Sequence, residues 1–359
     1  METGANLMIE KLENNNELIT VGIALYNNQN YIKRCVNSVI NQSYQNIEIL
    51  IVDDGSNDNS LEVVSSIVDH RIRIIKKENN GLSSVRQKCL ELSKGKYICF
   101  IDGDDYIKTD YIEKLYRAVT SNKCDIAICG TIFLKDNEEE ITDSSDAYSF
   151  FKQKYTEISI SDLQNCYCNL LNEFYMSDSW NKMYRKDFLI NNNLNFKLSK
   201  GYNGTDLIFN HKVLLYSPKI VTITDRLYIH MIYEKSATHR KGKNLLKSML
   251  VAIEQIVLES KRLDIFPLIR NQIANLFYLL IRNAIQDLYT DSNGKRKKFY
   301  EALNLAYIEI DDFQNRIIKM RIEHSISKSL LLFSAILSAH NRTLTYVYFC
   351  IRDKFEKVV

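Results

Sequence analysis

The stretch FIDGDDYI, residues 100–107, ends an apolar run and then places three carboxylates within four positions. The run YICFI at 97–101 has the composition of a buried strand. Asp102, Asp104 and Asp105 therefore lie directly beyond a strand, where like charges repel one another. Such crowding is relieved by a cation, by a hydrogen-bonding ligand or by solvent. This turn is the first place to look for a functional site.

Strand-like and helical segments alternate around this stretch, from residue 18 to about residue 130. Apolar runs predict the strands, and apolar residues spaced three or four apart predict the helices between them. The predicted strands are 19–26, 47–52, 71–75, 97–101 and 124–130, and the predicted helices are 31–40, 61–68, 82–90 and 109–119. This alternation predicts a mostly parallel α/β sheet flanked by helices.

The first four predicted strands end in polar turns, which read ALYNN, DDGSND, ENNGLSS and DGDD. In open α/β sheets, ligands bind beyond the carboxyl ends of the strands. The four turns are therefore expected to meet at one ligand-binding edge.

The bulk composition argues against several classes of protein. The 359 residues include 47 basic and 44 acidic ones, a net charge of +3, which is too small to predict nucleic acid as the main partner. The eight cysteines are scattered without a CxxC pair, which favours a reduced protein over a disulfide scaffold or a zinc site. The N-terminus lacks a signal-like apolar core, and the apolar stretch at 330–339 is half of the ~20 residues that a membrane span needs. We expect a cytoplasmic protein that can lie peripherally at the inner face of the membrane.

In their order along the chain, ALYNN, VDDGSND, NNGLSSVR and YICFIDGDDYI resemble the motifs of family 2 glycosyltransferases with the GT-A fold. The resemblance covers roughly residues 18–240, and its specificity comes from the ordered combination of motifs. It implies an inverting, metal-dependent enzyme that transfers a sugar from a nucleotide sugar, with UDP the expected nucleotide. The acceptor would be a hydroxyl of a glycan or a lipid-linked molecule in surface-polysaccharide synthesis.

The resemblance also implies a division of the chain into four parts. These are a polar N-terminal segment (1–17), a nucleotide-sugar-binding half (18–130), an acceptor-binding half (131–240) and a C-terminal helical domain (241–359). The helical stripes beyond 241 predict core or oligomer contacts, and residues 325–359 also suit an interfacial helix on a membrane.

On the donor side, the family pattern makes Asp104 the ligand of Mn²⁺ or Mg²⁺, which would bridge the phosphate oxygens. Asp102 would face the ribose or the base. Asp54 would accept the uracil N3–H, with Asp53 supporting its turn. The other residues expected at the nucleotide sugar are Ala24, Tyr26, Arg86 and Gly103. An ordinary turn at DDGS, and an arginine on a helix surface at 86, remain open alternatives.

On the acceptor side, GTDLIF at 204–209 matches a G-E-D-x-x-F pattern in which Asp206 would be the general base. Thr205 stands where the family has glutamate. This departure keeps open a weak or inactive protein that binds nucleotide sugars within a glycan-assembly complex. Asp206 could also cap the helix that follows it.

Two further segments contribute acceptor and metal predictions. SDSWNKMY at 177–184 resembles an acceptor-binding segment, in which Trp180 would stack on a sugar ring or be buried in the core. The residues expected at the acceptor are Asp105, Trp180, Asn181, Lys182 and Thr205. His230 and His239 lie where some relatives complete the metal shell with a histidine, and a purely structural histidine is the alternative.

Other enzyme classes fit the sequence less well. No G-x-G-x-x-G follows the first strand, which argues against a dinucleotide-dependent oxidoreductase. The Gly-rich basic loop of a nucleotidyltransferase is also missing there. A phosphatase with an aspartate nucleophile could use FIDGDD but would leave VDDGS unexplained.

Overall fold

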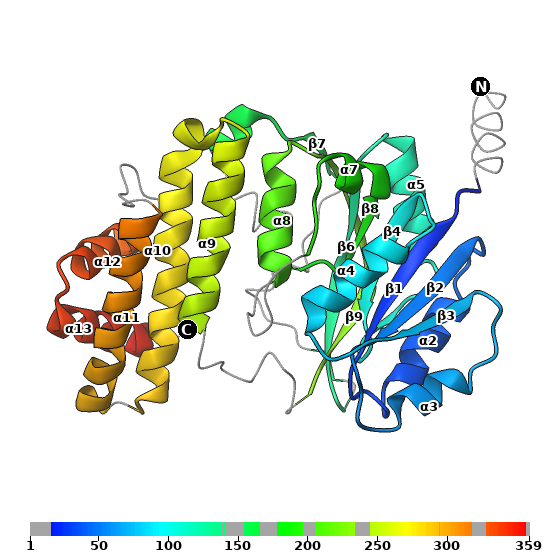
Figure 1. Ribbon diagram of the computed structural model, residues 1–359, viewed down its shortest axis with the longest axis horizontal. Helices are drawn as coiled ribbons and strands as arrows, with labels where there is room; N and C mark the ends of the chain where they lie inside the picture. The colour runs from blue at the N-terminus through cyan, green and yellow to red at the C-terminus, as the bar shows by residue number, and fades with distance from the viewer. Residues whose placement is uncertain are drawn as a thin grey trace. The chain divides into compact units, whose positions relative to one another are not determined.

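The computed structural model describes residues 16–137, 139–140, 154–165, 178–196, 205–233, 245–293, 295–317 and 328–356 (Figure 1). The chain packs as two compact units. The α/β unit comprises Met1–Ser159, Leu171–Gly201 and Thr205–Ser236, and the helical unit comprises Ile160–Leu170, Tyr202–Gly204 and Ala237–Val359. His239 and the side chain of Thr205 lie outside the described part of the structure.

The first half of the α/β unit has the alternating order that the sequence predicts. Its elements are β1 (Ile19–Leu25), α2 (Ile32–Ile40), β2 (Ile47–Asp53), α3 (Ser60–Ser65), β3 (Ile72–Lys76), α4 (Leu82–Leu92), β4 (Tyr97–Asp102) and α5 (Tyr111–Ser121). Strand β1 pairs in parallel with β2 and β4, and β2 pairs in parallel with β3. The strands are continuous apolar runs because helices cover both faces of a parallel sheet.

The second half of the unit makes the sheet mixed. Its elements are β5 (Tyr106–Ile107), β6 (Ile126–Lys135), β7 (Lys154–Glu157), β8 (Lys182–Arg185), α7 (Lys186–Asn191), α8 (Thr205–Leu215) and β9 (Lys219–Ile232). The sheet order is β3-β2-β1-β4-β8-β6-β9-β5, with β7 also on β9. Strand β8 is antiparallel to β4 and β6, whereas β6 and β9 are parallel, so the expectation of a mostly parallel sheet holds fully for the first half and in part for the second.

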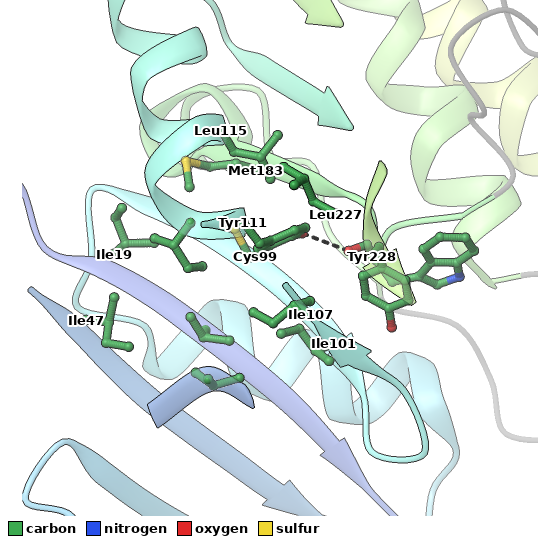
Figure 2. Close-up of a cluster of buried hydrophobic side chains, with 14 of the residues drawn as sticks. Ile19, Ile47, Cys99, Ile101, Ile107, Tyr111, Leu115, Met183, Leu227 and Tyr228 are labelled. Carbon is green, nitrogen blue, oxygen red and sulfur yellow. Dashed lines mark hydrogen bonds between the residues drawn. The ribbon is translucent and has the colours of Figure 1, made fainter. Parts of the chain in front are cut away.

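The core of this unit joins the early strands to the late ones (Figure 2). Ile101 from β4 and Met183 from β8 belong to one buried cluster with Tyr228 from β9. Tyr111 on α5 donates a hydrogen bond to the carbonyl of Trp180 at 2.9 Å, drawn as the dashed line. Cys99 is fully buried among these side chains, as its apolar setting predicts. This packing holds β8 and β9 beside the end of β4.

The helical unit contains five long helices in its described part. They are α9 (Leu245–Arg262), α10 (Phe266–Asp291), α11 (Arg296–Arg316), α12 (Lys328–Ser338) and α13 (Arg342–Glu356). Leu330 and Phe333 of α12 are fully buried, so this stretch packs within its own unit, whereas Leu331 and Leu332 are exposed. Among the described residues, no helix is both long and apolar enough to cross a bilayer.

Candidate active site

The ends of β1 and β4 approach each other closely at Gly103. Ala24 pairs with Asp102 in the parallel register, and Gly103 follows directly. A Cβ at residue 103 would lie 2.6 Å from the carbonyl oxygen of Ala24, which is closer than atoms can pack. The predicted residues Ala24, Asp102 and Gly103 therefore share one edge of the sheet, and Tyr26 lies 45% exposed just beyond it.

The turn after β2 is closed by hydrogen bonds from the chain itself. Asp53 Oδ1 accepts from the backbone N–H of Ser56 at 3.1 Å and from its hydroxyl at 2.5 Å. Asp54 Oδ1 accepts from Lys77 Nζ and from the N–H of Asn80 (2.9 Å), and Oδ2 accepts from the N–H of Gly81 (2.8 Å). Asp53 thus supports its own turn, and Asp54 joins the turn after β2 to the turn after β3. A lone pair on Asp54 Oδ2 remains for a further donor.

The turn after β4 contains two neighbouring carboxylates in different environments. Asp105 is 1% exposed, and its carboxylate accepts from the Tyr228 hydroxyl at 2.7 Å and the Met231 N–H at 2.8 Å. Asp105 therefore holds β9 against the turn. Little of its hydrogen-bonding capacity remains for the predicted acceptor contact. Burial, reinforced by the charges of Asp105 and Asp102, raises the pKa of Asp104 to about 7.

His230 completes the environment of Asp105. Its Nδ1 lies 3.1 Å from Asp105 Oδ2. Burial opposes a positive charge on the ring, but Asp105, Asp102 and Asp104 outweigh burial and raise the pKa of His230 to about 9. The contact with Asp105 occupies Nδ1, and the metal-ligand role of His230 stays a prediction.

Arg86 connects the end of β4 to helix α8. Its guanidinium is 1% exposed, donates from one NH2 group to Asp102 Oδ1 at 2.8 Å and makes an ion pair through the other with Asp206 Oδ2. The sequence predicted an arginine that reaches the nucleotide or points into solvent. The structure instead shows a buried cation between two carboxylates. Asp206 Oδ1 is buried and has no hydrogen-bond partner among the described residues.

Trp180 belongs to a buried aromatic cluster. The indole is 5% exposed and stacks on Tyr228, with ring centroids 4.5 Å apart, and on His230 at 5.3 Å. Phe133 contacts the indole edge-on. This is the core alternative that the sequence left open, because a ring with so little exposed surface does not offer a face to a sugar.

Asn181 and Lys182 are also buried and are held by polar contacts within the chain. Asn181 Nδ2 donates to the carbonyl of Cys129 at 3.1 Å. Lys182 Nζ donates to Asn181 Oδ1 and to the carbonyl of Asp178, each at 2.7 Å. Burial lowers the pKa of Lys182 to about 7. Their predicted acceptor contacts therefore require access that the described packing does not provide.

Two residues at this edge were missed by the sequence analysis. Arg34 on α2 donates to the carbonyl of Asp104 at 3.1 Å and to the Tyr233 hydroxyl at 2.8 Å, and its guanidinium lies over the Tyr106 ring. Tyr233 stacks on Tyr31, with centroids 4.1 Å apart. The signal for Tyr233 was its place directly after the apolar-rich run of β9, which we did not interpret as a strand.

The chemistry of this edge suits a divalent cation at Asp104. A desolvated carboxylate beside two others is stabilised by a positive ion. Within the described ranges, no three His, Cys, Asp or Glu side chains form a ready-made metal cluster. A cation at Asp104 would therefore complete its shell with phosphate oxygens and water, which is common for Mg²⁺.

Comparisons with known proteins agree with these observations. The family model "Glycosyl transferase family 2" matches residues 20–191. Glycosyltransferase GlyG of Streptococcus pneumoniae is 32% identical over 221 residues, which cover 60% of this chain and 70% of that protein. Glycosyltransferase GlyA of the same species is 34% identical over 240 residues, 66% of this chain, but this chain spans only 34% of GlyA.

A solved structure extends the likeness in fold. The crystal structure of S. aureus TarS 1–349 in complex with UDP-GlcNAc matches with a TM-score of 0.67 over 94% of this chain and 92% of that chain. The two sequences are 16% identical, so this match shows a shared GT-A-like fold and no more. The family model and the length of the match to GlyG carry the assignment of family. The chain belongs to family 2 of the glycosyltransferases.

Proposed function

We propose that this glycosyltransferase moves a sugar from a UDP-sugar to a hydroxyl of a glycan or lipid-linked acceptor in surface-polysaccharide synthesis, with inversion at the anomeric carbon. The contact of Arg86 with both Asp102 and Asp206 carries the proposal. This contact supports the proposal because Asp102 and Asp206 share one guanidinium, although the two aspartates are 104 positions apart in the sequence. TarS in complex with UDP-GlcNAc supports UDP as the first nucleotide to test.

In the proposed reaction, Asp206 takes the proton of the acceptor hydroxyl. Arg86 holds Oδ2 of this carboxylate, which leaves Oδ1 as the oxygen that can accept the proton. The hydroxyl oxygen then attacks the anomeric carbon from the side opposite the bond to UDP, so that the configuration inverts. The electron pair of the broken C–O bond leaves with UDP.

The donor edge would hold the nucleotide and its diphosphate. Asp104 and water would bind a divalent cation, which acts as a Lewis acid for the departing diphosphate when it is bound. Asp54 Oδ2 keeps the lone pair that uracil N3–H requires. We further propose a cytoplasmic location with peripheral membrane contact through the C-terminal helices.

A second function deserves a test because of one observation. The expected base is engaged in an ion pair with a buried arginine, and Thr205 precedes it where the family has glutamate. A protein that keeps this ion pair with its ligands bound would hold a nucleotide sugar without transferring it. It would then act as a scaffold in a glycan-assembly complex.

Calorimetric titration of UDP tests the donor assignment. We expect binding to the wild type with Mn²⁺ and weaker binding with a chelator. Asp104→Ala should lose the metal-dependent part, whereas Asp225→Ala, which removes a half-exposed carboxylate paired with Lys114, should retain it. If UDP binds under neither condition, the donor assignment is wrong. UDP binding without hydrolysis or transfer of any UDP-sugar would favour the scaffold.

A further inference from the structure

The helical unit carries a positively charged hollow of about 490 Å³ on α11 and α13. Its lining consists of Arg296, Lys297, Tyr300, Glu301, Asn304 and Arg342. Three cations thus face a single carboxylate. A volume of this size accommodates a small polar group and its immediate neighbours.

Stacking and hydrogen bonds hold the two arginines of this hollow in place. Arg296 donates from Nε to the Tyr300 hydroxyl at 2.8 Å, and its guanidinium carbon lies 5.1 Å from the Tyr300 ring centroid and 5.7 Å from that of Tyr346. The guanidinium of Arg342 lies 5.5 Å from the same Tyr300 centroid and donates to Asn304 Oδ1 at 3.4 Å. A guanidinium stacked on a ring keeps N–H groups at its edge for an anion, and less entropy is lost when that anion binds.

The charge of this pair is not neutralised by acidic side chains. In the described part of the chain, neither Arg296 nor Arg342 makes an ion pair, whereas Arg262 of the same unit pairs with Glu259 at 2.6 Å and Arg316 pairs with Asp312 at 3.0 Å. Burial opposes ionisation of Tyr300, but its contacts with Thr343 and Arg296 and the charges of both arginines outweigh burial and lower its pKa. The hollow is therefore a region of positive potential.

Exposed apolar side chains continue the same face of α11. Leu305 lies one turn beyond Glu301, and Ile308 lies one turn beyond Asn304, so both project from the strip that lines the hollow. Each of the two side chains is 65% exposed. Cations beside exposed aliphatic side chains are typical of a surface that meets anionic lipid headgroups.

We propose that the hollow between α11 and α13 binds the phosphate group of an anionic lipid and so holds the helical unit at a membrane surface. Two guanidinium groups on one ring offer N–H donors from two directions, which suits a tetrahedral phosphodiester better than a planar carboxylate. Leu305 and Ile308 enter the headgroup region beside it. The inference rests on the peripheral membrane contact proposed above and gives that contact a specific site.

Vesicle co-sedimentation of the full chain tests this site. The vesicles are phosphatidylcholine alone and an equimolar mixture with phosphatidylglycerol, each at low and high salt. The wild type should bind only the mixed vesicles, and high salt should release it. Arg296→Gln/Arg342→Gln should lower the partition coefficient by about tenfold or more, because each basic residue near an anionic surface contributes about 1 kcal/mol. Arg262→Gln/Arg316→Gln removes the same charge from arginines that already have acidic partners, and it should bind almost as the wild type does.

Three results would overturn the proposal. The wild type could fail to bind mixed vesicles, or the two double variants could lose binding equally, which would show a diffuse charge effect. Glycerol 3-phosphate could also shift the NMR signals of the hollow while vesicles leave them unchanged, which would make the ligand a soluble phosphate ester. UDP titration of each variant confirms folding and separates the two proposals. For the wild type, absent vesicle binding with UDP binding retained contradicts only the lipid site, and vesicle binding without UDP binding contradicts only the donor site.

Discussion

The turns after β2 and β4 both contain neighbouring aspartates, but the hydrogen-bond partners of these aspartates lie at different distances along the chain. After β2, the carboxylates of Asp53 and Asp54 accept hydrogen bonds from donors that lie within 27 positions along the chain. After β4, Asp105 is held by Tyr228 and Met231, more than 120 positions away. The first turn is thus completed locally, whereas the second exists only once the late strands have joined the sheet.

This difference supports the proposal that the chemistry takes place at the second turn. Long-range contacts bring Arg86 and Asp206 to the end of β4, together with a carboxylate at Asp104 whose pKa is raised. The crowded carboxylates of the second turn gain free energy when a cation binds beside them.

The largest expected effect follows from replacing the proposed general base, Asp206. Asp206→Asn should lower the rate of sugar transfer by about 10²–10⁴-fold, because general-base catalysis contributes that much. Binding of UDP should change little, since the contacts expected at Asp54 and Asp104 lie in the turns after β2 and β4 and do not involve Asp206. Transfer or donor hydrolysis gives the rate, and calorimetry with UDP is the control. Full activity of the variant would remove Asp206 from the mechanism.

A smaller but still large effect is expected from replacing Arg86, the cation between Asp102 and Asp206. Arg86→Met should destabilise the α/β unit by about 3 kcal/mol, because it leaves the partly buried carboxylates of Asp102 and Asp206 without their partner. Arg86→Lys keeps the charge and should recover part of this loss. Arg73→Met is the control, since that arginine is one-third exposed and lies 3.7 Å from Glu48. Equal unfolding free energies for the Arg86→Met and Arg73→Met variants in urea would contradict the bridging role.

The same contrast between local and long-range contacts explains which parts of the fold could be predicted from the sequence. The alternation from β1 to α5 was predicted because each element is a short apolar run or a helical stripe with a polar turn between them. The pairing of β8 with β4 was not predicted, since a four-residue strand carries almost no periodic signal. Strand β9 was missed although KIVTITDRLYIHMI is 14 residues long, because its apolar residues do not alternate strictly.

The site residues divide in a similar way. The sequence placed Asp102, Gly103 and Ala24 at one edge because strand ends in a parallel sheet must meet there. It could not show that Trp180 and Lys182 are buried, because burial at these positions depends on β9 and on contacts from distant segments. The bridge formed by Arg86 could not be predicted either, because a single arginine on a helix gives no pattern from which its partners can be identified.

The two turns can be compared directly by removing one charge from each. Asp105→Asn should destabilise the fold by about 2–3 kcal/mol, because the amide cannot accept all of the hydrogen bonds from Tyr228, His230 and Met231. Asp54→Asn should cost about 1–2 kcal/mol, since Lys77 is partly exposed and can turn to solvent. Urea unfolding measures both values. A larger loss at Asp54 would show that the local turn, and not the long-range one, dominates stability.

The smallest effect is a dependence of stability on pH that arises beside the second turn. Burial lowers the pKa of Lys182 to about 7, whereas an unfolded lysine titrates near 10.4. Between these values the unfolded chain binds a proton that the folded chain does not, so this group makes the folded state more stable as pH rises from about 7. Below about pH 7 both states are protonated, and the full penalty of a buried ammonium remains.

Lys182→Met should therefore flatten the pH dependence of unfolding. Relative to the variant, the wild type should gain stability between pH 7 and pH 9 by at most about 1.4 kcal/mol per pH unit. The lost hydrogen bonds to Asp178 and Asn181 lower the stability of the variant by an amount that does not change with pH, so the slope is the informative quantity. Lys114→Met is the matched control, because the hydrogen bonds of Lys114 to Asp110 and Asp225 raise its pKa, which puts its titration above this window. If the wild type and Lys182→Met have parallel curves, Lys182 is charged in the folded protein, and the late half of the sheet is more hydrated than its packing indicates.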